Sequence, residues 1–393
     1  MPLRYTLLPE NNSRLAVRAI LKKIYLNFRE YLFRVIALFI FDNRSPDFGS
    51  GEDIRKVLFI RVDRIGDLVL STPALRALKQ AFPRSELVVL ASPSNQSLLL
   101  HNPYVDRVVV YDEKKRLGDK IGIIRKLRAY GFDLAIDPYP DYELRTAVIA
   151  FLSGARKRVG YASYGREVFF NVVTPKMKAN QHFVDLTLGI LNPLGMNARD
   201  KAPEIFLTDG ERKWARTWLK EKGVRGKPLV GIHPGGYYES QRWPPERFAD
   251  LIDQLQKDRR LDLIVFGGPG EEYLTGKICS MVTGEVLTCP EDDIRRFAAL
   301  LSHCSLFICN NSGPLHIAAG LGIPTISMMG PTIKERWMPI GDIHKVLRID
   351  DLPCIGCNRG YCRIKTHDCM RLITPSMVLE AAEGILQPWN GNG

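Results

Sequence analysis

The chain has 393 residues, of which 45% are hydrophobic and 25% are charged, and this composition excludes a disordered or fibrous protein. At about 100 to 200 residues per domain, the length predicts two domains. The formal net charge of +12 favours an anionic partner, which leaves nucleic acid, a phosphorylated small molecule or an acidic membrane surface. Because the chain has neither paired metal-binding fingers nor an aromatic sheet motif, we expect no nucleic-acid partner.

Eight cysteines in a chain of this length do not make the disulfide framework of a small secreted protein, so the cytoplasm is the expected compartment. The apolar stretch from Tyr31 to Phe41 is interrupted by Arg34. It is shorter than the ~20 residues that a membrane span requires and lacks a small-residue cleavage site. We therefore expect neither a membrane span nor a signal peptide.

The segment from Leu15 to Phe41 has the periodicity of a basic amphipathic helix. Two interpretations are open and compatible: the helix packs on its own domain, or it lies in a membrane interface among anionic lipid headgroups. The residues that share one side, followed by the basic residues between them, are Ile20, Ile24, Phe28, Tyr31, Val35 and Leu38, then Arg18, Lys22, Lys23 and Arg29.

Two series of short apolar runs, each alternating with helical stretches, predict buried parallel strands. A polar segment at residues 209–227 separates the two series. We therefore predict two Rossmann-like, doubly wound α/β domains with ligands beyond the carboxyl ends of their strands. The expected divisions are an N-terminal segment at 1–54, an N-terminal domain at 55–208 and a C-terminal domain at 209–393. The expected strands are 56–61, 86–92, 107–112 and 133–137, then 228–234, 261–268, 305–311 and 324–330. Whether the helix after Thr374 completes the second domain or returns to the first is open.

The first predicted strand leads into a loop that contains Asp63 and Asp67. This loop lacks the GxGxxG spacing of a dinucleotide site, and its carboxylates would repel a pyrophosphate placed directly on them. A carboxylate here suits a general base that takes a proton from an attacking hydroxyl. Asp67 is the candidate base, with a helix N-terminal cap as the alternative role, and Asp63 is the weaker candidate.

The run Asn310-Asn311-Ser312-Gly313-Pro314-Leu315-His316 follows the strand predicted at 305–311 and opens an apolar helix. With Pro314 early in that helix, free backbone N–H groups and the helix dipole would face an anion. Gly313 would allow close approach of the backbone, and Ser312 precedes it. His316 would add a donor to a phosphate, although a histidine beside an apolar helix is often a core residue.

Two further loops follow strands of the second series. Arg242, in the segment that begins at His233-Pro234-Gly235, would neutralise developing diphosphate charge without a metal. Glu271, in the Gly-Gly-Pro-Gly-Glu turn, would hold a ribose or sugar hydroxyl. The alternative roles are a surface cation for Arg242 and a helix N-terminal acid for Glu271.

In combination, these motifs resemble the bacterial heptosyltransferases of glycosyltransferase family 9, from lipopolysaccharide core synthesis. They are the D-x-x-G-D loop with the following TPAL, the HPG…RWPPERFADLI segment, the GGPGE turn and the NNSGPLHIAAGLGIPT run, and they occur in the family's order. The resemblance covers roughly Arg55 to Gln387.

The resemblance implies a GT-B fold and an inverting transfer from ADP-heptose that needs no metal and no cofactor. The implied acceptor is the lipopolysaccharide inner core on Kdo and lipid A, and the implied location is the inner face of the inner membrane, as a peripheral protein. By the same resemblance, Asp67 is the catalytic aspartate, Arg242 the diphosphate contact and Glu271 the nucleotide contact. Ser312, Gly313 and His316 would form the donor-phosphate loop, with Asn311 beside them.

Asn311 departs from the family pattern, because many members carry an aspartate there, and a donor other than ADP-heptose is therefore an alternative. Two other classes compete: a non-catalytic nucleotide-binding assembly protein, and an enzyme of the same architecture, such as an epimerase, that acts on nucleotide sugars without an acceptor.

Four cysteines, Cys354, Cys357, Cys362 and Cys369, fall within sixteen positions, a density typical of metal ligands. The gaps of four and six residues depart from paired CxxC motifs, and reduced cysteines in a loop are the alternative. The sequence therefore assigns no metal.

Overall fold

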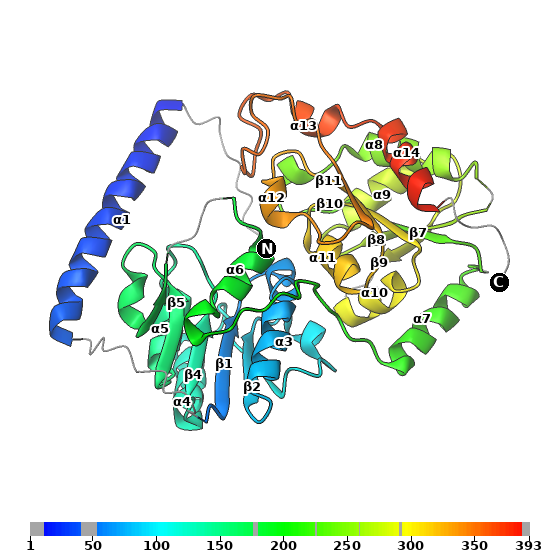
Figure 1. Ribbon diagram of the computed structural model, residues 1–393. Coiled ribbons are helices and arrows are strands. Elements are labelled where there is room, and N and C mark those ends of the chain that lie inside the picture. Colours follow the sequence, from blue (N-terminus) through cyan, green and yellow to red (C-terminus); the bar gives the residue numbers. More distant parts are fainter. Residues whose placement is uncertain are drawn as a thin grey trace.

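A computed structural model describes residues 12–40, 53–175, 180–224, 226–258, 260–290 and 293–386. Its described residues form two six-stranded sheets in which every strand pair is parallel. Figure 1 shows the two sheets in separate domains with helices around them. This arrangement confirms the predicted pair of Rossmann-like domains.

The N-terminal sheet has the strand order β3-β2-β1-β4-β5-β6. Its central strands are apolar on both faces, as expected for strands covered by helices on both sides of a sheet. The strands are β1 Lys56–Arg61, β2 Glu86–Ala91, β3 Arg107–Val110, β4 Leu134–Asp137, β5 Lys157–Tyr161 and β6 Val172–Thr174. The helices are α2 Ile65–Val69, α3 Thr72–Ala81, α4 Leu117–Tyr130, α5 Arg145–Leu152 and α6 Phe183–Gly189, with short 3-10 turns at Gln96–Leu99, Arg166–Phe169 and Asn192–Leu194.

The C-terminal sheet has the order β12-β11-β10-β7-β8-β9. The strands are β7 Leu229–His233, β8 Asp262–Gly267, β9 Leu287–Pro290, β10 Leu306–Asn310, β11 Thr325–Met328 and β12 His344–Leu347. The helices are α7 Asp209–Glu221, α8 Pro245–Leu255, α9 Glu272–Met281, α10 Ile294–Leu301, α11 Gly313–Gly320, α12 Lys334–Trp337, α13 Asp368–Arg371 and α14 Pro375–Leu386, with a 3-10 turn at Glu239–Gln241. Helix α14 packs on α8 and on β10 to β12, so the last helix completes the second domain.

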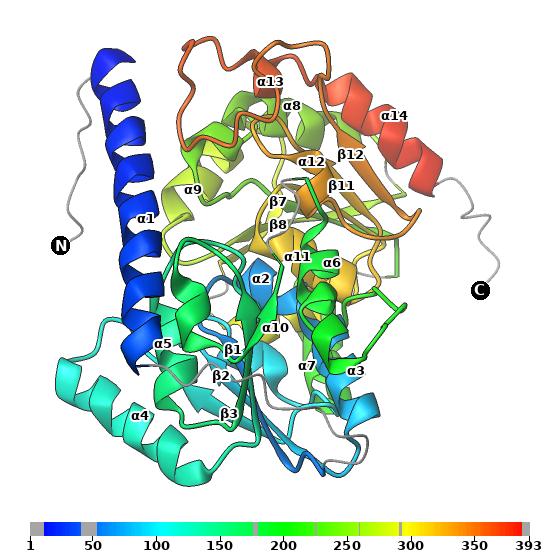
Figure 2. The same cartoon turned by 60° about the vertical axis from the view of Figure 1, so that its left-hand side comes forward.

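The N-terminal segment forms the predicted helix, α1, from Asn12 to Ile40. Figures 1 and 2 show α1 as a long helix along one side of the molecule. It is anchored by Arg29, which donates to the carbonyls of Tyr164 and Tyr142 at 3.0 and 2.8 Å, and by Phe33, whose ring meets Phe169 edge to face. Leu26 is buried as well.

The predicted apolar side of α1 does not share this packed surface. Ile20, Ile24, Phe28 and Tyr31 are all exposed, and Val35 is half-buried. The side chains of Arg18 and Leu38, which were assigned to the same helix, lie outside the described residues. Two sides of α1 therefore have different surroundings, one packed on the N-terminal domain and one apolar and open. No described helix is both long enough and apolar enough to cross a membrane.

Candidate active site

Helix α2 and helix α11 meet where the two domains touch, at the carboxyl ends of β1 and β10 (Figure 2). Gly66 in α2 lies so close to α11 that a Cβ added there would be 2.7 Å from Cδ2 of His316. On the other side, Gly313 at the start of α11 packs against Ile65. A side chain at Gly66 would force the His316 ring or the helix to move, and one at Gly313 would press on Ile65, so both glycines favour the close approach of the helices.

Asp67 is the third residue of α2, and Arg64 occupies the N-cap position. The Asp67 carboxylate takes a hydrogen bond from the Arg64 backbone, so it also stabilises the first turn of its helix. Packing of protein around it raises the pKa of the Asp67 carboxyl, while the charges of Arg61, Arg64 and Arg336 oppose that rise. A raised pKa makes this carboxylate a stronger base than an exposed aspartate.

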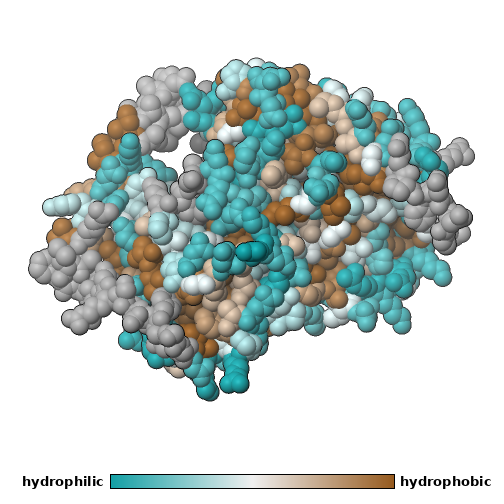
Figure 3. All heavy atoms as spheres, viewed as in Figure 1, coloured by the Kyte–Doolittle hydropathy of each residue, from teal (hydrophilic) through white to brown (hydrophobic). Residues whose placement is uncertain are grey.

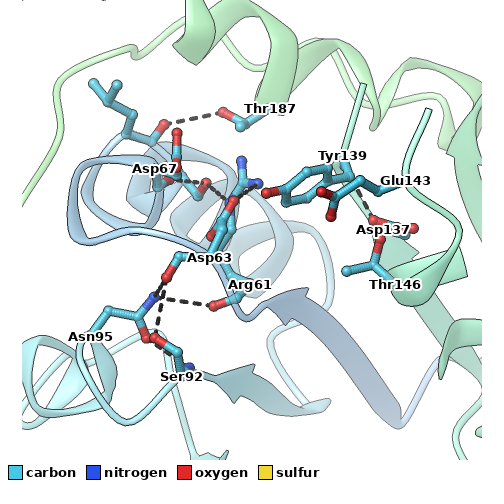
Figure 4. Close-up of polar contacts among 12 residues, drawn as sticks. Arg61, Asp63, Asp67, Ser92, Asn95, Asp137, Tyr139, Glu143, Thr146 and Thr187 are labelled. Atoms are coloured by element: carbon cyan, nitrogen blue, oxygen red, sulfur yellow. Dashed lines mark hydrogen bonds and ion pairs between the residues drawn. The ribbon is translucent and has the colours of Figure 1, made fainter. Parts of the chain in front are cut away.

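Asp63 lies beside Asp67 in the same loop, and Figure 4 shows both carboxylates gathered with Tyr139 around the Arg61 side chain. Arg61 is fully buried and donates from Nη1 to Oδ2 of Asp63 at 2.8 Å and from Nε to Ser71 at 2.8 Å. Burial raises the pKa of Asp63 to about 7, with Arg61 opposing and Asp67 adding to the rise. Among the described residues, its Oδ1 finds no hydrogen-bond partner.

Neutral side chains hold the backbone on either side of these acids. Asn95 donates from Nδ2 to the carbonyls of Arg61 and Asp63 at 3.2 and 3.1 Å, and Thr187 donates to the carbonyl of Leu70 at 3.1 Å (Figure 4). The Asn95 contacts hold the loop between β1 and α2, and the Thr187 contact holds the end of α2, without neutralising the carboxylates.

In the C-terminal domain, Ser312 is the N-cap residue of α11 and Gly313 is its first residue. Ser312 makes no side-chain cap, so its hydroxyl does not occupy the N–H groups of the first turn. Those groups and the helix dipole are suited to an anion. Asn311 next to them donates to the Thr332 hydroxyl at 3.1 Å.

His316 is buried, with its ring 6.4 Å from that of Trp337 and against Gly66. Burial, followed by the neighbouring His182 and His344, lowers the pKa of His316 to about 3, so its imidazole is neutral at physiological pH. Its Nδ1 is buried without a partner among the described residues. His316, which the sequence predicts to donate a hydrogen bond to a phosphate, therefore lies at the junction of the two domains as a neutral imidazole.

Arg242 and Glu271 lie together beside β7. Burial by itself would raise the pKa of Glu271. The hydrogen bond and charge of His233, together with the Gly268 amide and the Arg242 charge, outweigh burial and lower this pKa to about 2. The Glu271 carboxylate meets Nε2 of His233 at 3.0 Å and accepts from the Gly268 amide at 3.0 Å. Arg242 donates from Nε to the Gly236 carbonyl at 2.9 Å, which orients its guanidinium.

Glu271 is also the N-cap residue of α9, but its side chain makes no cap hydrogen bond. It folds back onto the turn at Gly235, where an added Cβ would collide with the carboxylate. The carboxylate thus serves the loop beside Arg242 rather than the end of its own helix.

Several charged and aromatic neighbours of the site were missed by sequence reasoning. Arg64 crosses between the domains to stack on Tyr237, with 3.8 Å from guanidinium carbon to ring centroid. Arg336 comes from α12 in the C-terminal domain and acts on Asp67. His233 stood in the quoted HPG motif and Arg64 in the D-x-x-G-D loop, so their positions were visible, whereas nothing in the sequence marks Arg336.

Comparison with known proteins agrees with this arrangement. The family model described as glycosyltransferase family 9 (heptosyltransferase) matches residues 121–367, more than half of the chain. The lipooligosaccharide heptosyltransferase 2 of Campylobacter jejuni is 23% identical over 329 residues, which are 82% of this chain and 96% of that protein.

Two solved structures share the fold. A family 9 glycosyl transferase from Veillonella parvula has a TM-score of 0.77 at 23% identity, covering 86% of this chain and 99% of that one. An E. coli heptosyltransferase with ADP-2-deoxy-2-fluoro heptose has a TM-score of 0.62 at 19% identity, covering 84% of this chain and 99% of that one. The two domains thus form a GT-B fold, and the chain belongs to glycosyltransferase family 9, the heptosyltransferase family.

Proposed function

We propose that this enzyme transfers heptose from ADP-heptose to the lipopolysaccharide inner core, either Kdo-lipid A or a heptosylated core, with inversion and without a metal. The observation that carries the proposal is the contact between α2 and α11, which brings Asp67 of one domain next to the start of α11 in the other. A candidate base and a candidate phosphate site thus share one junction. The family relatives named as heptosyltransferases supply the substrate class.

In this mechanism Asp67 takes the proton from the acceptor hydroxyl as that oxygen attacks the anomeric carbon of the donor. The bond from that carbon to the diphosphate breaks, and the ADP leaving group gains negative charge. Arg242 and the N–H groups at Ser312 and Gly313 offset this charge. The cations around Asp67 keep a fraction of its carboxyl ionised despite burial.

The test is Asp67→Asn, which keeps the shape of the side chain and removes its basicity. We expect ADP binding to persist while transfer falls about 100- to 10,000-fold, the usual effect of losing a general base. Asp250→Asn on the exposed side of α8 is the matched control and should transfer at the wild-type rate. Wild-type transfer by Asp67→Asn would remove Asp67 from the mechanism.

Asn311 bears on the choice of donor, because its amide contributes hydrogen bonds but no charge. Competition among ADP-heptose, ADP-glucose and UDP-glucose for the purified enzyme distinguishes ADP-heptose from other nucleotide sugars. Tight binding of another donor in place of ADP-heptose would reject heptose transfer while leaving sugar transfer in place. Donor binding without turnover on any acceptor would favour the non-catalytic assembly protein.

We also propose that the open side of α1 lies on an anionic membrane surface, where a lipid-anchored acceptor is found. This side presents Ile20, Ile24, Phe28 and Tyr31, with exposed fractions of 58% or more, and Lys23 is exposed near them. Figure 3 shows apolar side chains on the described part of α1. Apolar side chains beside cations suit the boundary between acyl chains and anionic headgroups. The net charge of +12 favours the same surface.

Sedimentation with phosphatidylglycerol-containing vesicles tests this interface. The double substitution Ile24→Ser with Phe28→Ser should reduce the bound fraction severalfold, because both side chains are exposed and neither supports the packed side of α1. Tyr273→Ser on α9, which removes an even more exposed side chain, is the control and should bind normally. Equal binding of the double variant and wild type would refute the membrane interface.

A further inference from the structure

The loop between β12 and α13 surrounds a hollow that the proposed reaction does not use. The hollow measures about 420 Å³ and is lined by four cysteines, Cys354, Cys357 and Cys362 of the loop and Cys369 of α13. His367 and Ser240 also reach it. Sixteen residues of one segment thus direct every one of their thiols toward the same space.

This loop has few features of its own that would hold it in shape. It contains no strand, and a helix begins only at Asp368. Asn358, Lys365 and His367 have left-handed backbone conformations, with φ of 50°, 61° and 57°. Non-glycine residues keep such conformations only where surrounding structure enforces them. Leu352 and Ile355 pack on the core where the loop begins, but Tyr361 and Ile364 farther along are exposed, so the later part of the loop has little apolar packing to supply that enforcement.

The spacing of the thiols indicates which kind of group would fit. Cys369 is buried, Cys354 and Cys362 are half-buried, and Cys357 is exposed, so the thiols line the hollow from its floor to its rim. Among the residues that the structure describes, no three His, Cys, Asp or Glu side chains are placed to hold one metal ion in common. Four cysteine thiolates are also the ligand set of an iron–sulfur cluster, which distributes them over several metal atoms around a larger centre than a single ion.

The charge around the hollow suits the same group. Four thiolates repel one another unless a cationic centre lies between them. A cluster with four thiolate ligands stays anionic, and Arg359 and Arg363 line the hollow with it. We propose that Cys354, Cys357, Cys362 and Cys369 bind an iron–sulfur cluster that holds this loop in its folded shape.

The consequence of such a cluster would be structural, through the segment that ends at Arg242. Ser240 donates to the carbonyl of Arg359 at 2.7 Å, and Nε2 of His367 lies 2.7 Å from the Ser240 carbonyl oxygen. Gly360 packs so closely on the Tyr238 ring that an added Cβ would lie 2.7 Å from it. The cysteine loop therefore supports the segment at 238–242 from outside, and the cluster takes no part in sugar transfer.

The test measures bound metal in the full-length chain, purified without oxygen and then reconstituted with ferrous iron and sulfide under reducing conditions. We expect iron and acid-labile sulfide at one cluster per chain, with the visible absorption of thiolate-bound iron. Cys357→Ser and Cys362→Ser should each lower bound iron more than tenfold. Neither thiol is fully buried, so both variants should fold, which far-ultraviolet circular dichroism verifies.

Cys279→Ser is the matched control, because Cys279 is a half-buried cysteine on α9 and does not line the hollow. It should keep the wild-type iron content. Stoichiometric zinc without iron or sulfide would overturn the cluster and leave a single-ion thiolate site. Absence of bound metal after reconstitution, or equal iron in the cysteine variants and the control, would overturn the site altogether. None of these measurements depends on the donor or acceptor.

Discussion

Gly66→Ala is expected to slow sugar transfer by forcing α2 away from α11. The new Cβ would lie 2.7 Å from Cδ2 of His316, whereas ordinary contact begins at 3.4 Å, so the ring or the helix must move by about 0.7 Å. His316 is buried and has Trp337 beside it, which limits how far its ring can retreat. The displacement is therefore passed to α2 and to Asp67, one residue further along.

The size of the effect follows from that displacement. A misplacement of about 1 Å at reacting groups costs up to about 100-fold in rate, so we expect kcat to fall about 10- to 100-fold. Overpacking should cost about 1–3 kcal/mol of folding free energy, which leaves a folded protein. The affinity for ADP should change little, because the proposed nucleotide contacts Arg242, Glu271 and the start of α11 all belong to the C-terminal domain.

The assay follows release of ADP with the lipid acceptor present, alongside calorimetric binding of ADP and thermal unfolding. Gly122→Ala is the matched control, because Gly122 is also in a helix, α4, and has nothing within 4 Å of an added Cβ. That variant should be fully active and slightly more stable, by about 0.5–1 kcal/mol. A folded Gly66→Ala enzyme with wild-type kcat would refute the dependence of transfer on the α2–α11 contact.

Three further substitutions test the electrostatics of the fold. Burial raises the pKa of Asp63 to about 7, so the folded protein favours the protonated carboxyl. The free energy of unfolding of the wild type should therefore fall as the pH rises from about 4 to 7, by at most about 1.4 kcal/mol per pH unit. Urea unfolding should show that Asp63→Asn removes this loss. Asp137→Ala leaves Arg166 without its fully buried partner and should lower the free energy of unfolding by about 3–5 kcal/mol; a loss below 1 kcal/mol would contradict a buried ion pair. Despite partial burial, Arg295 and the Thr208 cap lower the pKa of Glu211 to about 2. The wild type should therefore be more stable than Glu211→Gln at neutral pH, and this difference in the free energy of unfolding should shrink as the pH falls from 4.5 to 2. A difference that stays constant with pH would refute the pairing.

The sequence predicted eight strands from their apolar runs, including the edge strand β3, and missed β5, β6, β9 and β12. β5 at Lys157–Tyr161 has two cations in five residues, so it has no continuous apolar run although it pairs on both sides. β6, β9 and β12 are short strands, and each of these three forms the edge of its sheet. Strands of this kind are fixed by pairing with a neighbour, which local composition does not reveal.

The candidate site was predictable as far as topology determines it. Parallel strands deliver their following loops to one edge of a sheet, so Asp67 and Ser312 could be assigned to that edge from their distance past a strand. Contacts that cross between domains could not be assigned in this way. Arg336 reaches the surroundings of Asp67 only because α12 docks on the N-terminal domain, where Trp337 stacks on Phe183 at 4.8 Å.

The same cross-domain contacts bear on how the site is assembled. Of the cations that act on Asp67, Arg61 and Arg64 belong to its own domain and Arg336 belongs to the other. Because burial alone favours the protonated and inactive carboxyl, each cation that approaches increases the ionised fraction. Through α12 the C-terminal domain therefore adds a cation near Asp67, at the same junction where α11 packs on α2. The charged groups that act on Asp67 are therefore contributed by both domains, so this set is complete only where the two domains are in contact.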